Sequence, residues 1–300
     1  MFNESAIKKS GVVPVVLQRL RDYSMLAKFR LSLLVVFSSG IAFMIAEKGN
    51  IDWNYFWILI LGGFLTTAAA NALNQVIEKD FDLLMSRTQN RPLPQQRLLP
   101  VEALLIAGIM GVCGISILWI YFNQMAALLS AIALLSYAFI YTPLKRFSPI
   151  AVLVGAFPGA IPPMIGWVAA TGHLDATAFV LFGIQFMWQF PHFWSIAWVC
   201  YDDYLKAGYK LLPSREGRSK FSALQIVFYI LALIPVSLLP YYFGLSGLVS
   251  CLLILVCGIV FLFQGIKLFR LRNVAAAKQL MFGSFFYLPI VQLAIFFDKI

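Results

Sequence analysis

The sequence predicts an all-α membrane protein with nine transmembrane helices around a central cavity that opens to the cytoplasmic side. The first observation behind this prediction is composition: 61% of the 300 residues are hydrophobic, only 12% are charged, and the mean hydropathy is +0.84. Such values are typical of proteins that cross a membrane several times and exclude an ordinary soluble domain. The four cysteines are scattered and lack the spacing of a metal site or a disulfide framework.

The second observation is a series of nine apolar runs, each near the roughly 20 residues that a spanning helix requires. Because no polar stretch between them is long enough to form a soluble domain, we expect one membrane domain over residues 29–300, preceded by a cytoplasmic segment over residues 1–28. The expected spans are 29–46, 53–77, 101–121, 125–143, 149–170, 176–200, 221–243, 246–268 and 278–297.

The third observation is the distribution of basic residues. Of the 23 Lys and Arg, 21 lie in the N-terminal segment, in the loops after the second, fourth, sixth and eighth runs, or at the ends of the runs that border them, and only Lys48 and Lys299 lie elsewhere. Basic residues gather on the cytoplasmic side of membrane proteins. We therefore expect a multi-pass protein of the bacterial cytoplasmic (inner) membrane, with its N-terminus cytoplasmic and its C-terminus on the opposite side. This pattern accounts for the net charge of +10 without a nucleic-acid partner.

The N-terminal segment carries Lys8, Lys9, Arg19 and Arg21 among apolar residues. It lacks the apolar stretch and small-residue cleavage site of a secretory signal. We expect an amphipathic segment that lies on the cytoplasmic surface in contact with membrane lipid.

The polar side chains that end the second run form the first candidate site. At about 100° per residue, Asn71, Asn74, Glu78 and Asp82 fall within a sector of roughly 80° on a helix, whereas Asp80 points nearly the opposite way. Amide and carboxylate oxygens suit Mg²⁺, which also takes substrate phosphates as ligands. Arg87 and Arg91 follow, and arginine suits the phosphates themselves. The alternative is a solvated helix end with mixed charges; the cost of acidic groups at membrane depth favours the site.

A second candidate site follows an aromatic run that starts at Gln185 and ends at Pro213. His192 lies deep in this run, either as a neutral core residue hydrogen-bonded to Gln185 or Gln189, or as a ligand of haem iron. Four charged residues follow it: Asp202, Asp203, Lys206 and Lys210. The two aspartates suit a second Mg²⁺ or are ordinary interface charges. The two lysines contact either diphosphate oxygens or anionic lipid headgroups.

Both stretches resemble a known family. Asn-x-x-Asn-x-x-x-Glu-x-x-x-Asp, from Asn71 to Asp82, followed by Met-x-Arg-Thr-x-x-Arg-Pro-Leu, resembles the first aspartate-rich motif of the UbiA-type intramembrane prenyltransferases. Glu78 stands where many bacterial members carry Asp. Trp-Gln-Phe-Pro-His-Phe around His192 resembles the branch that transfers farnesyl groups to protoheme. The segments 141–146 and 155–167 are also similar, and the resemblance runs from about residue 26 to residue 213.

The resemblance implies a Mg²⁺-dependent enzyme that transfers farnesyl from farnesyl diphosphate to a vinyl group of haem b with addition of water, giving haem O. A downstream haem A synthase is the possible partner. The implied catalytic residues are Asn74, Glu78, Asp82 and Asp203, and the implied metal ligands are these four with Asp202. The implied substrate-binding residues are Asn71, Arg87, Arg91, Lys28, Lys145, Tyr141, His192, Tyr204, Lys206 and Lys210.

Three departures from the family pattern concern these implied roles. Phe29 replaces the proline of the usual Lys-Pro-Arg before the first span, and Tyr201 and Asp202 replace the usual Arg-Glu. Val199 stands four residues before Asp203, where other prenyltransferases carry a second aspartate, so the second metal site has fewer carboxylate ligands.

Two other functions remain open at this stage. One is prenyl transfer to an aromatic quinone precursor, against which the Trp-Gln-Phe-Pro-His sequence argues. The other is a non-catalytic transporter of haem or lipid, since intramembrane carboxylates and broken helices also occur in transporters. A transporter's charges should lie near the membrane midplane, whereas these lie at the cytoplasmic ends of the spans.

Overall fold

The computed structural model describes residues 12–47, 49–214 and 216–300. The part of the N-terminal segment that holds Lys8 and Lys9 lies outside these ranges, as do Lys48 and Arg215. The helices are α1 (Val12–Leu26), α2 (Phe29–Ala46), α3 (Trp53–Asp82), α4 (Pro100–Tyr121), α5 (Gln124–Leu135), the π-helix η2 (Ser136–Tyr141), α6 (Thr142–Leu144), α7 (Ala151–Thr171), α8 (Ala176–Val199), α9 (Tyr201–Lys206), α10 (Lys220–Tyr242), α11 (Leu248–Leu271) and α12 (Val274–Phe297).

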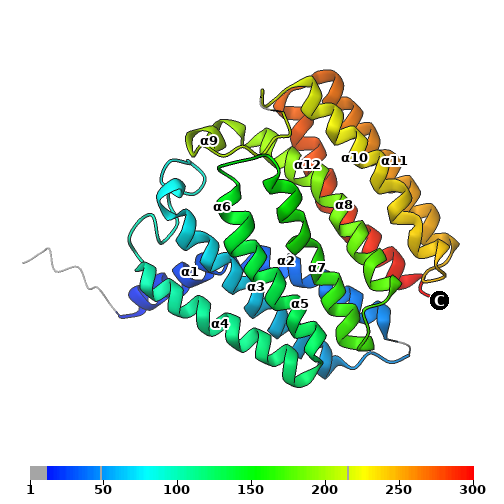
Figure 1. Ribbon diagram of the computed structural model, residues 1–300, viewed down its shortest axis with the longest axis horizontal. Coiled ribbons are helices and arrows are strands. Elements are labelled where there is room, and N and C mark those ends of the chain that lie inside the picture. The colour runs from blue at the N-terminus through cyan, green and yellow to red at the C-terminus, as the bar shows by residue number, and fades with distance from the viewer. Residues whose placement is uncertain (1–11, 48, 215) are drawn as a thin grey trace, which may run out of the picture.

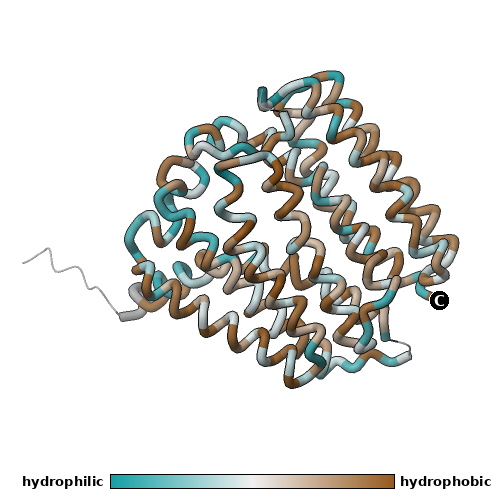
Figure 2. Tube along the Cα trace, viewed as in Figure 1, coloured by the Kyte–Doolittle hydropathy of each residue, from teal (hydrophilic) through white to brown (hydrophobic). Residues whose placement is uncertain are grey.

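Each of the nine expected spans corresponds to a helical segment. Within the described ranges, eight of these segments are long and apolar enough to cross a membrane, with α5, η2 and α6 counted as one. The ninth, α8, has 24 residues but carries Gln185, Gln189, Pro191 and His192, which lower its hydropathy. The all-helical membrane class is confirmed, and nine crossings stay a prediction. Figure 2 shows hydrophobic residues along the helices and hydrophilic ones at the end that holds α9 and the segment before α4.

Polar residues set many of the helix starts, because a side-chain oxygen accepts from a free backbone N–H of the first turn. Asp52 accepts from the N–H groups of Asn54 and Tyr55 at the start of α3. Asn123 accepts from Ala126 N–H at the start of α5, so the short link predicted between the third and fourth spans is a capped turn. Asp175, Ser219 and Asn273 cap α8, α10 and α12 in the same way.

The long helices run side by side (Figure 1), and their contacts close into a ring. Each spanning segment packs against the next one along the chain, and α12 returns to α2. Contacts of α2 with α7 and of α8 with α12 cross the ring and fill part of its interior. Small residues allow the closest approaches: a Cβ atom added at Gly114 would lie 2.7 Å from the carbonyl oxygen of Gly62, so α3 and α4 touch backbone to backbone there.

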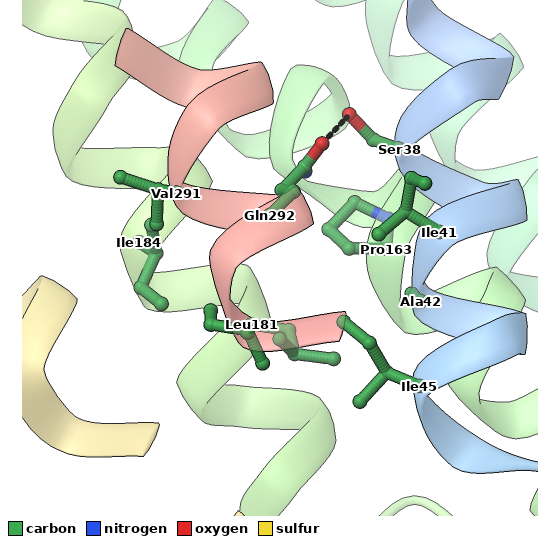
Figure 3. Close-up of a pocket in the computed structure, with 10 residues that line it drawn as sticks. Ser38, Ile41, Ala42, Ile45, Pro163, Leu181, Ile184, Val291 and Gln292 are labelled. Atoms are coloured by element: carbon green, nitrogen blue, oxygen red, sulfur yellow. Dashed lines mark hydrogen bonds between the residues drawn. The ribbon is translucent and has the colours of Figure 1, made fainter. Parts of the chain in front are cut away.

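A chain of buried polar side chains links four helices inside the ring. Ser38 Oγ on α2 lies 3.3 Å from Gln292 Oε1 on α12, and Gln292 Nε2 donates to Gln185 Oε1 on α8. Gln185 Nε2 donates to the carbonyl of Gly159 on α7. Figure 3 shows the small cavity beside the first pair, of about 10 Å³. The larger cavity that we expect at the cytoplasmic end remains a prediction.

The first helix, α1, is attached by polar and charged groups to the loop before α4 and to the first turn of α4. Asp22 is 1% exposed and lies 3.0 Å from Arg97 Nε. Tyr23 donates to Glu102 over 2.6 Å, and Arg19 lies 3.6 Å from the same carboxylate. The apolar residues Val16, Leu17 and Leu20 remain 50–60% exposed. These contacts hold the helix against the bundle while its apolar side chains face outward.

Candidate active site

The polar face predicted on the second span is present at the end of α3. Asn71, Asn74, Glu78 and Asp82 are all buried, between 0% and 5% exposed. The side chain of Asp80 is 73% exposed and pairs with its neighbour Lys79. The helical period therefore places the four side chains as the sequence predicts, with two carboxylates and two amides facing the protein interior.

Three basic side chains contact three of these polar residues. Lys145 Nζ lies 2.8 Å from Glu78 Oε1, and both side chains are at most 10% exposed. Arg91 Nη1 lies 2.6 Å from Asp82 Oδ2. Each proposed metal ligand of α3 is thus in contact with a cation, because Lys28 Nζ also lies 3.0 Å from Asn74 Oδ1. The three cations come from three different segments of the chain, and all three were predicted as substrate-binding residues.

The π-helix η2 positions the residues that face α3 from the fourth span. Such segments carry one extra residue per turn and are frequent at functional sites. Thr142 Oγ1 donates to the carbonyl of Tyr137 and accepts from Asn74 Nδ2 over 3.1 Å. The ring of Tyr141 lies 4.5 Å from Lys145 Nζ, which is a cation–π contact. Beside this ring, burial disfavours the charged form of Lys145, but the Glu78 carboxylate raises its pKa above the ordinary value.

Lys28 reaches the site from the junction of α1 and α2. Its backbone is left-handed, with φ 45°, a conformation that non-glycine residues rarely adopt. Gln75 is fully buried, and its amide nitrogen donates to the carbonyls of Met25 at 2.9 Å and Leu26 at 2.7 Å. These two bonds tie the end of α1 to α3. They hold the junction in the shape that directs the Lys28 side chain toward Asn74.

The second acidic cluster joins the first through the loop after α3. Asp203 accepts from Ser86 Oγ at 3.1 Å and from the backbone N–H of Arg87 at 3.3 Å. It also pairs with Lys206 at 3.0 Å. The hydrogen bonds from Lys206, from Ser86 and from the Arg87 backbone lower the pKa of Asp203 below the usual range, although burial opposes this. Figure 1 shows α9 beside the loop that leads from α3 to α4.

Four predicted residues have contacts with groups other than the α3 carboxylates in the described part of the chain: Asp202, Arg87, Tyr204 and Lys210. Asp202 is 75% exposed on its side chain and pairs with Arg218, so its contacts do not support the predicted metal role. On a helix, consecutive residues point about 100° apart, which separates it from Asp203. The Arg87 guanidinium lies 5.8 Å from the Tyr204 ring. Lys210 is exposed and contacts the site through its backbone N–H, which donates to the Lys145 carbonyl.

His192 is buried between α8 and α12. Its Nδ1 lies 2.8 Å from Ser284 Oγ, so its partner is this serine and neither Gln185 nor Gln189 as expected for a core histidine. The imidazole stacks on Trp188 with ring centroids 4.3 Å apart. Its contacts do not include the acidic residues of α3. Whether it binds haem stays a prediction.

The donor set of the α3 face fits a hard cation. Glu78 and Asp82 supply carboxylate oxygens and Asn74 an amide oxygen, which are the ligand types that Mg²⁺ prefers. Asp82 Oδ1 is buried and has no hydrogen-bond partner among the described residues, so one carboxylate oxygen is available to a ligand. A cluster of three or more His, Cys, Asp or Glu side chains does not occur in the described part of the chain. A Mg²⁺ ion at this face would therefore need the amide oxygen of Asn74 and oxygens of the substrate in addition to the two carboxylates.

Several residues at the site were not singled out from the sequence. Thr142, Gln75 and Ser86 hold predicted residues in place, and they look ordinary in the sequence because their partners lie far away along the chain. Tyr209 is 4% exposed and packs against Phe81, with ring centroids 6.4 Å apart. Tyr209 belongs to the Gly-Tyr pair that follows α9, and this pair was the sequence feature that could have identified it.

Comparison with known proteins identifies the class and then the family. The matching family model is one of membrane prenyl-group transferases: the UbiA prenyltransferase family, matched by residues 33–289, so the chain belongs to that family. The resemblance inferred from the motifs is confirmed.

Named relatives and solved structures agree with this assignment. The chain is 51% identical to the protoheme IX farnesyltransferase of Cytophaga hutchinsonii over 94% of this chain and 99% of that protein. It is 42% identical to the protein of the same name from Flavobacterium johnsoniae, over 93% and 94%. The solved digeranylgeranylglyceryl phosphate synthase has a TM-score of 0.78 at 20% identity, over 94% and 98% of the two chains.

A UbiA homologue from Archaeoglobus fulgidus, solved with GPP and Mg²⁺ bound, has a TM-score of 0.71 at 14% identity, over 91% of this chain and 99% of that one. At such low identities the two solved structures establish the shared fold alone.

Proposed function

We propose that this protein transfers the farnesyl group of farnesyl diphosphate to a vinyl group of haem b, with addition of water, and releases haem O and diphosphate. The observation that carries the proposal is the 51% identity with a protoheme IX farnesyltransferase over nearly the full length of both chains. The site agrees with it, since buried carboxylates and cations meet at one end of the helix ring.

The first part of the mechanism concerns the leaving group. Diphosphate departs when its developing negative charge is neutralised. We assign Asn74, Glu78 and Asp82 as ligands of Mg²⁺, supported by Asn71, and a bound Mg²⁺ would supply part of that positive charge. The homologue with bound GPP and Mg²⁺ supports a metal requirement in the family. With these three residues holding the metal, the cations that contact them in this structure would be available to the diphosphate oxygens.

Those cations are Lys28, Lys145 and Arg91, which we assign to the diphosphate. Arginine binds phosphate through a planar fork and lysine binds it as a point charge, so the two residue types complement each other. Asp203 extends the site from the side of α9, with Lys206 and Arg87 at its edge. Tyr141 and Tyr204 present ring faces to Lys145 and Arg87.

The second part of the mechanism concerns the prenyl cation and the acceptor. Loss of diphosphate leaves an allylic cation that water would quench, and aromatic surroundings both exclude water and stabilise the cation. Trp188, Phe193 and Phe285 surround His192. We infer that His192 orients haem with the ring nitrogen that does not face Ser284. Binding of haem to the wild type should shift the absorption band of haem, and a His192→Ala variant should lose this shift. An unchanged spectrum and unchanged turnover in the variant would exclude this role.

The deciding experiment for the activity is a mass analysis of haem after incubation of the purified protein with haem b, farnesyl diphosphate and Mg²⁺, with EDTA as control. A farnesylated and hydrated haem that is absent with EDTA is the expected product. Unmodified haem together with a prenylated aromatic acid would assign the enzyme to quinone biosynthesis instead. Transfer to neither acceptor would favour a transporter.

We further propose the bacterial inner membrane as the location, with the N-terminus in the cytoplasm. The support is the position of the basic residues and the exposed apolar side chains of α1, which suit the lipid surface. Haem O must then reach an enzyme that oxidises it, and a haem A synthase is the proposed partner.

A further inference from the structure

Tyr209 brings a buried hydroxyl to the same site. The residue follows α9 and is 4% exposed, and its hydroxyl has no hydrogen-bond partner among the described residues. Lys145 Nζ lies 6.0 Å from the centroid of its ring. The ring packs between Phe81 of α3 and Tyr204 of α9, with centroids 6.4 and 6.0 Å away. A buried hydroxyl without a protein partner is costly, and a bound ligand that accepts its hydrogen bond offsets that cost.

The backbone fixes this tyrosine relative to both acidic clusters. Its N–H donates to the carbonyl of Tyr204 at 2.9 Å, and the N–H of Lys210 donates to the carbonyl of Lys145 at 3.0 Å. The phenol of a tyrosine ordinarily loses its proton only at about pH 10, so the Tyr209 hydroxyl is protonated at neutral pH and acts as a hydrogen-bond donor.

We propose that the Tyr209 hydroxyl donates a hydrogen bond to a diphosphate oxygen of the prenyl donor. This rests on the proposed function, because it needs a diphosphate in contact with Lys145 and Arg91. A diphosphate supplies several acceptor oxygens, whereas the Glu78 oxygen nearest Lys145 already accepts from that lysine at 2.8 Å. A neutral phenol adds a donor without adding charge. The Tyr209 hydroxyl thus adds a neutral donor to the diphosphate contacts that we assign to Lys28, Lys145 and Arg91.

The test is the binding of inorganic diphosphate to the purified full-length protein at saturating Mg²⁺, measured by calorimetry. Tyr209→Phe keeps the ring contacts and removes only the hydroxyl. Because a hydrogen bond to a charged group contributes substantially to binding, we expect diphosphate affinity to fall by about tenfold or more. The affinity for Mg²⁺ alone should stay unchanged.

The matched control is Tyr287→Phe. Tyr287 is also a buried tyrosine, but its hydroxyl donates to Ser237 Oγ at 3.0 Å, between α12 and α10. This variant should bind diphosphate like the wild type. Equal diphosphate affinity in Tyr209→Phe and the wild type would overturn the proposal. A fall in Mg²⁺ affinity would overturn it too, because the hydroxyl would then serve to orient Glu78.

The experiment separates this proposal from the proposed function. Inorganic diphosphate carries no prenyl group and needs no acceptor, so the measurement has the same meaning whether the acceptor is haem or an aromatic acid. If the wild type fails to bind diphosphate at all, the prenyltransferase mechanism itself is wrong. If the wild type binds it and Tyr209→Phe binds equally well, only the role of the tyrosine is wrong.

Discussion

Lys145 Nζ lies 2.8 Å from Glu78 Oε1, with both side chains almost fully buried. The two residues are 67 positions apart and belong to different spans. A buried pair of this kind loses much of its Coulomb attraction to desolvation, so stability is a weak reason for its presence. The pair instead keeps a proposed metal ligand and a proposed phosphate-binding cation next to each other before substrate arrives.

Removing one member of the Lys145–Glu78 pair should destabilise the protein. Lys145→Met or Glu78→Gln leaves an uncompensated buried charge, which costs about 3–5 kcal/mol. The double variant should recover most of this loss, while all three variants lose farnesyl transfer. Thermal unfolding in one detergent and product mass are the measurements.

The exposed Lys79–Asp80 pair on the same helix is the matched control for that comparison. Its replacement by Met and Asn should change the free energy of unfolding by at most about 1 kcal/mol. A double Lys145–Glu78 variant no more stable than the worse single variant would contradict the pairing.

Asp82 should govern the magnesium requirement. Asp82 Oδ1 has no partner among the described residues, while Oδ2 accepts from Arg91. Asp82→Asn keeps the shape and removes the charge, so we expect the Mg²⁺ concentration for half-maximal transfer to rise about tenfold or more. Titration of activity with Mg²⁺ measures this, and EDTA should abolish transfer in the wild type. An unaltered titration curve would remove Asp82 from the metal ligands.

Gln75 should act through Lys28. Gln75→Met removes the two bonds to the carbonyls of Met25 and Leu26, so the left-handed junction loses its support. We expect the KM for farnesyl diphosphate to rise several-fold, because one phosphate-binding cation is no longer held in place.

A double-mutant cycle separates this role from a general loss of stability. In a Lys28→Ala background, Gln75→Met should add little to the effect on KM. Additive effects of the two substitutions would mean that Gln75 only supports the fold. Gln95→Met provides an exposed control, since the one side-chain hydrogen bond of Gln95 among the described residues is to the Gln89 carbonyl of its own loop.

The buried polar chain of Ser38, Gln292 and Gln185 should contribute to stability more than to chemistry. Gln292→Leu removes its bonds to both partners and leaves Gln185 Oε1 without its donor. We expect a loss of about 1–3 kcal/mol in the free energy of unfolding. KM for farnesyl diphosphate should be unchanged, because these residues do not contact the acidic site. A raised KM with unchanged stability would instead place the chain on the substrate path.

The Asp203 carboxylate should give its contacts with the loop after α3 a dependence on pH. Its pKa is lowered in the folded state, so its contribution is complete above the unfolded value of about 4 and is lost as pH falls through the folded value. The N–H of Arg87, which donates to this carboxylate, should therefore exchange with solvent faster below about pH 4, after correction for intrinsic rates. In Asp203→Asn the same amide should show no such transition.

Local patterns in the chain were enough to predict the helices and one face of the site. Water-free lipid leaves few structures that satisfy the backbone, so an apolar run of sufficient length becomes a helix, and the start of the first span at Phe29 matches the expected limit. The 3.6-residue period then places Asn74, Glu78 and Asp82 together, because they belong to one helix.

Only the tertiary structure decided which partners these side chains have. The contacts of Lys145 with Glu78, of Asp203 with Ser86 and of His192 with Ser284 join residues 67 to 117 positions apart. Such contacts depend on how the ring of helices closes, which no local pattern encodes. For the same reason Asp202, adjacent to Asp203 in the chain, pairs with Arg218, and Tyr209 reaches the site from a loop. Periodicity places residues on one helix, whereas packing between helices determines which residues meet.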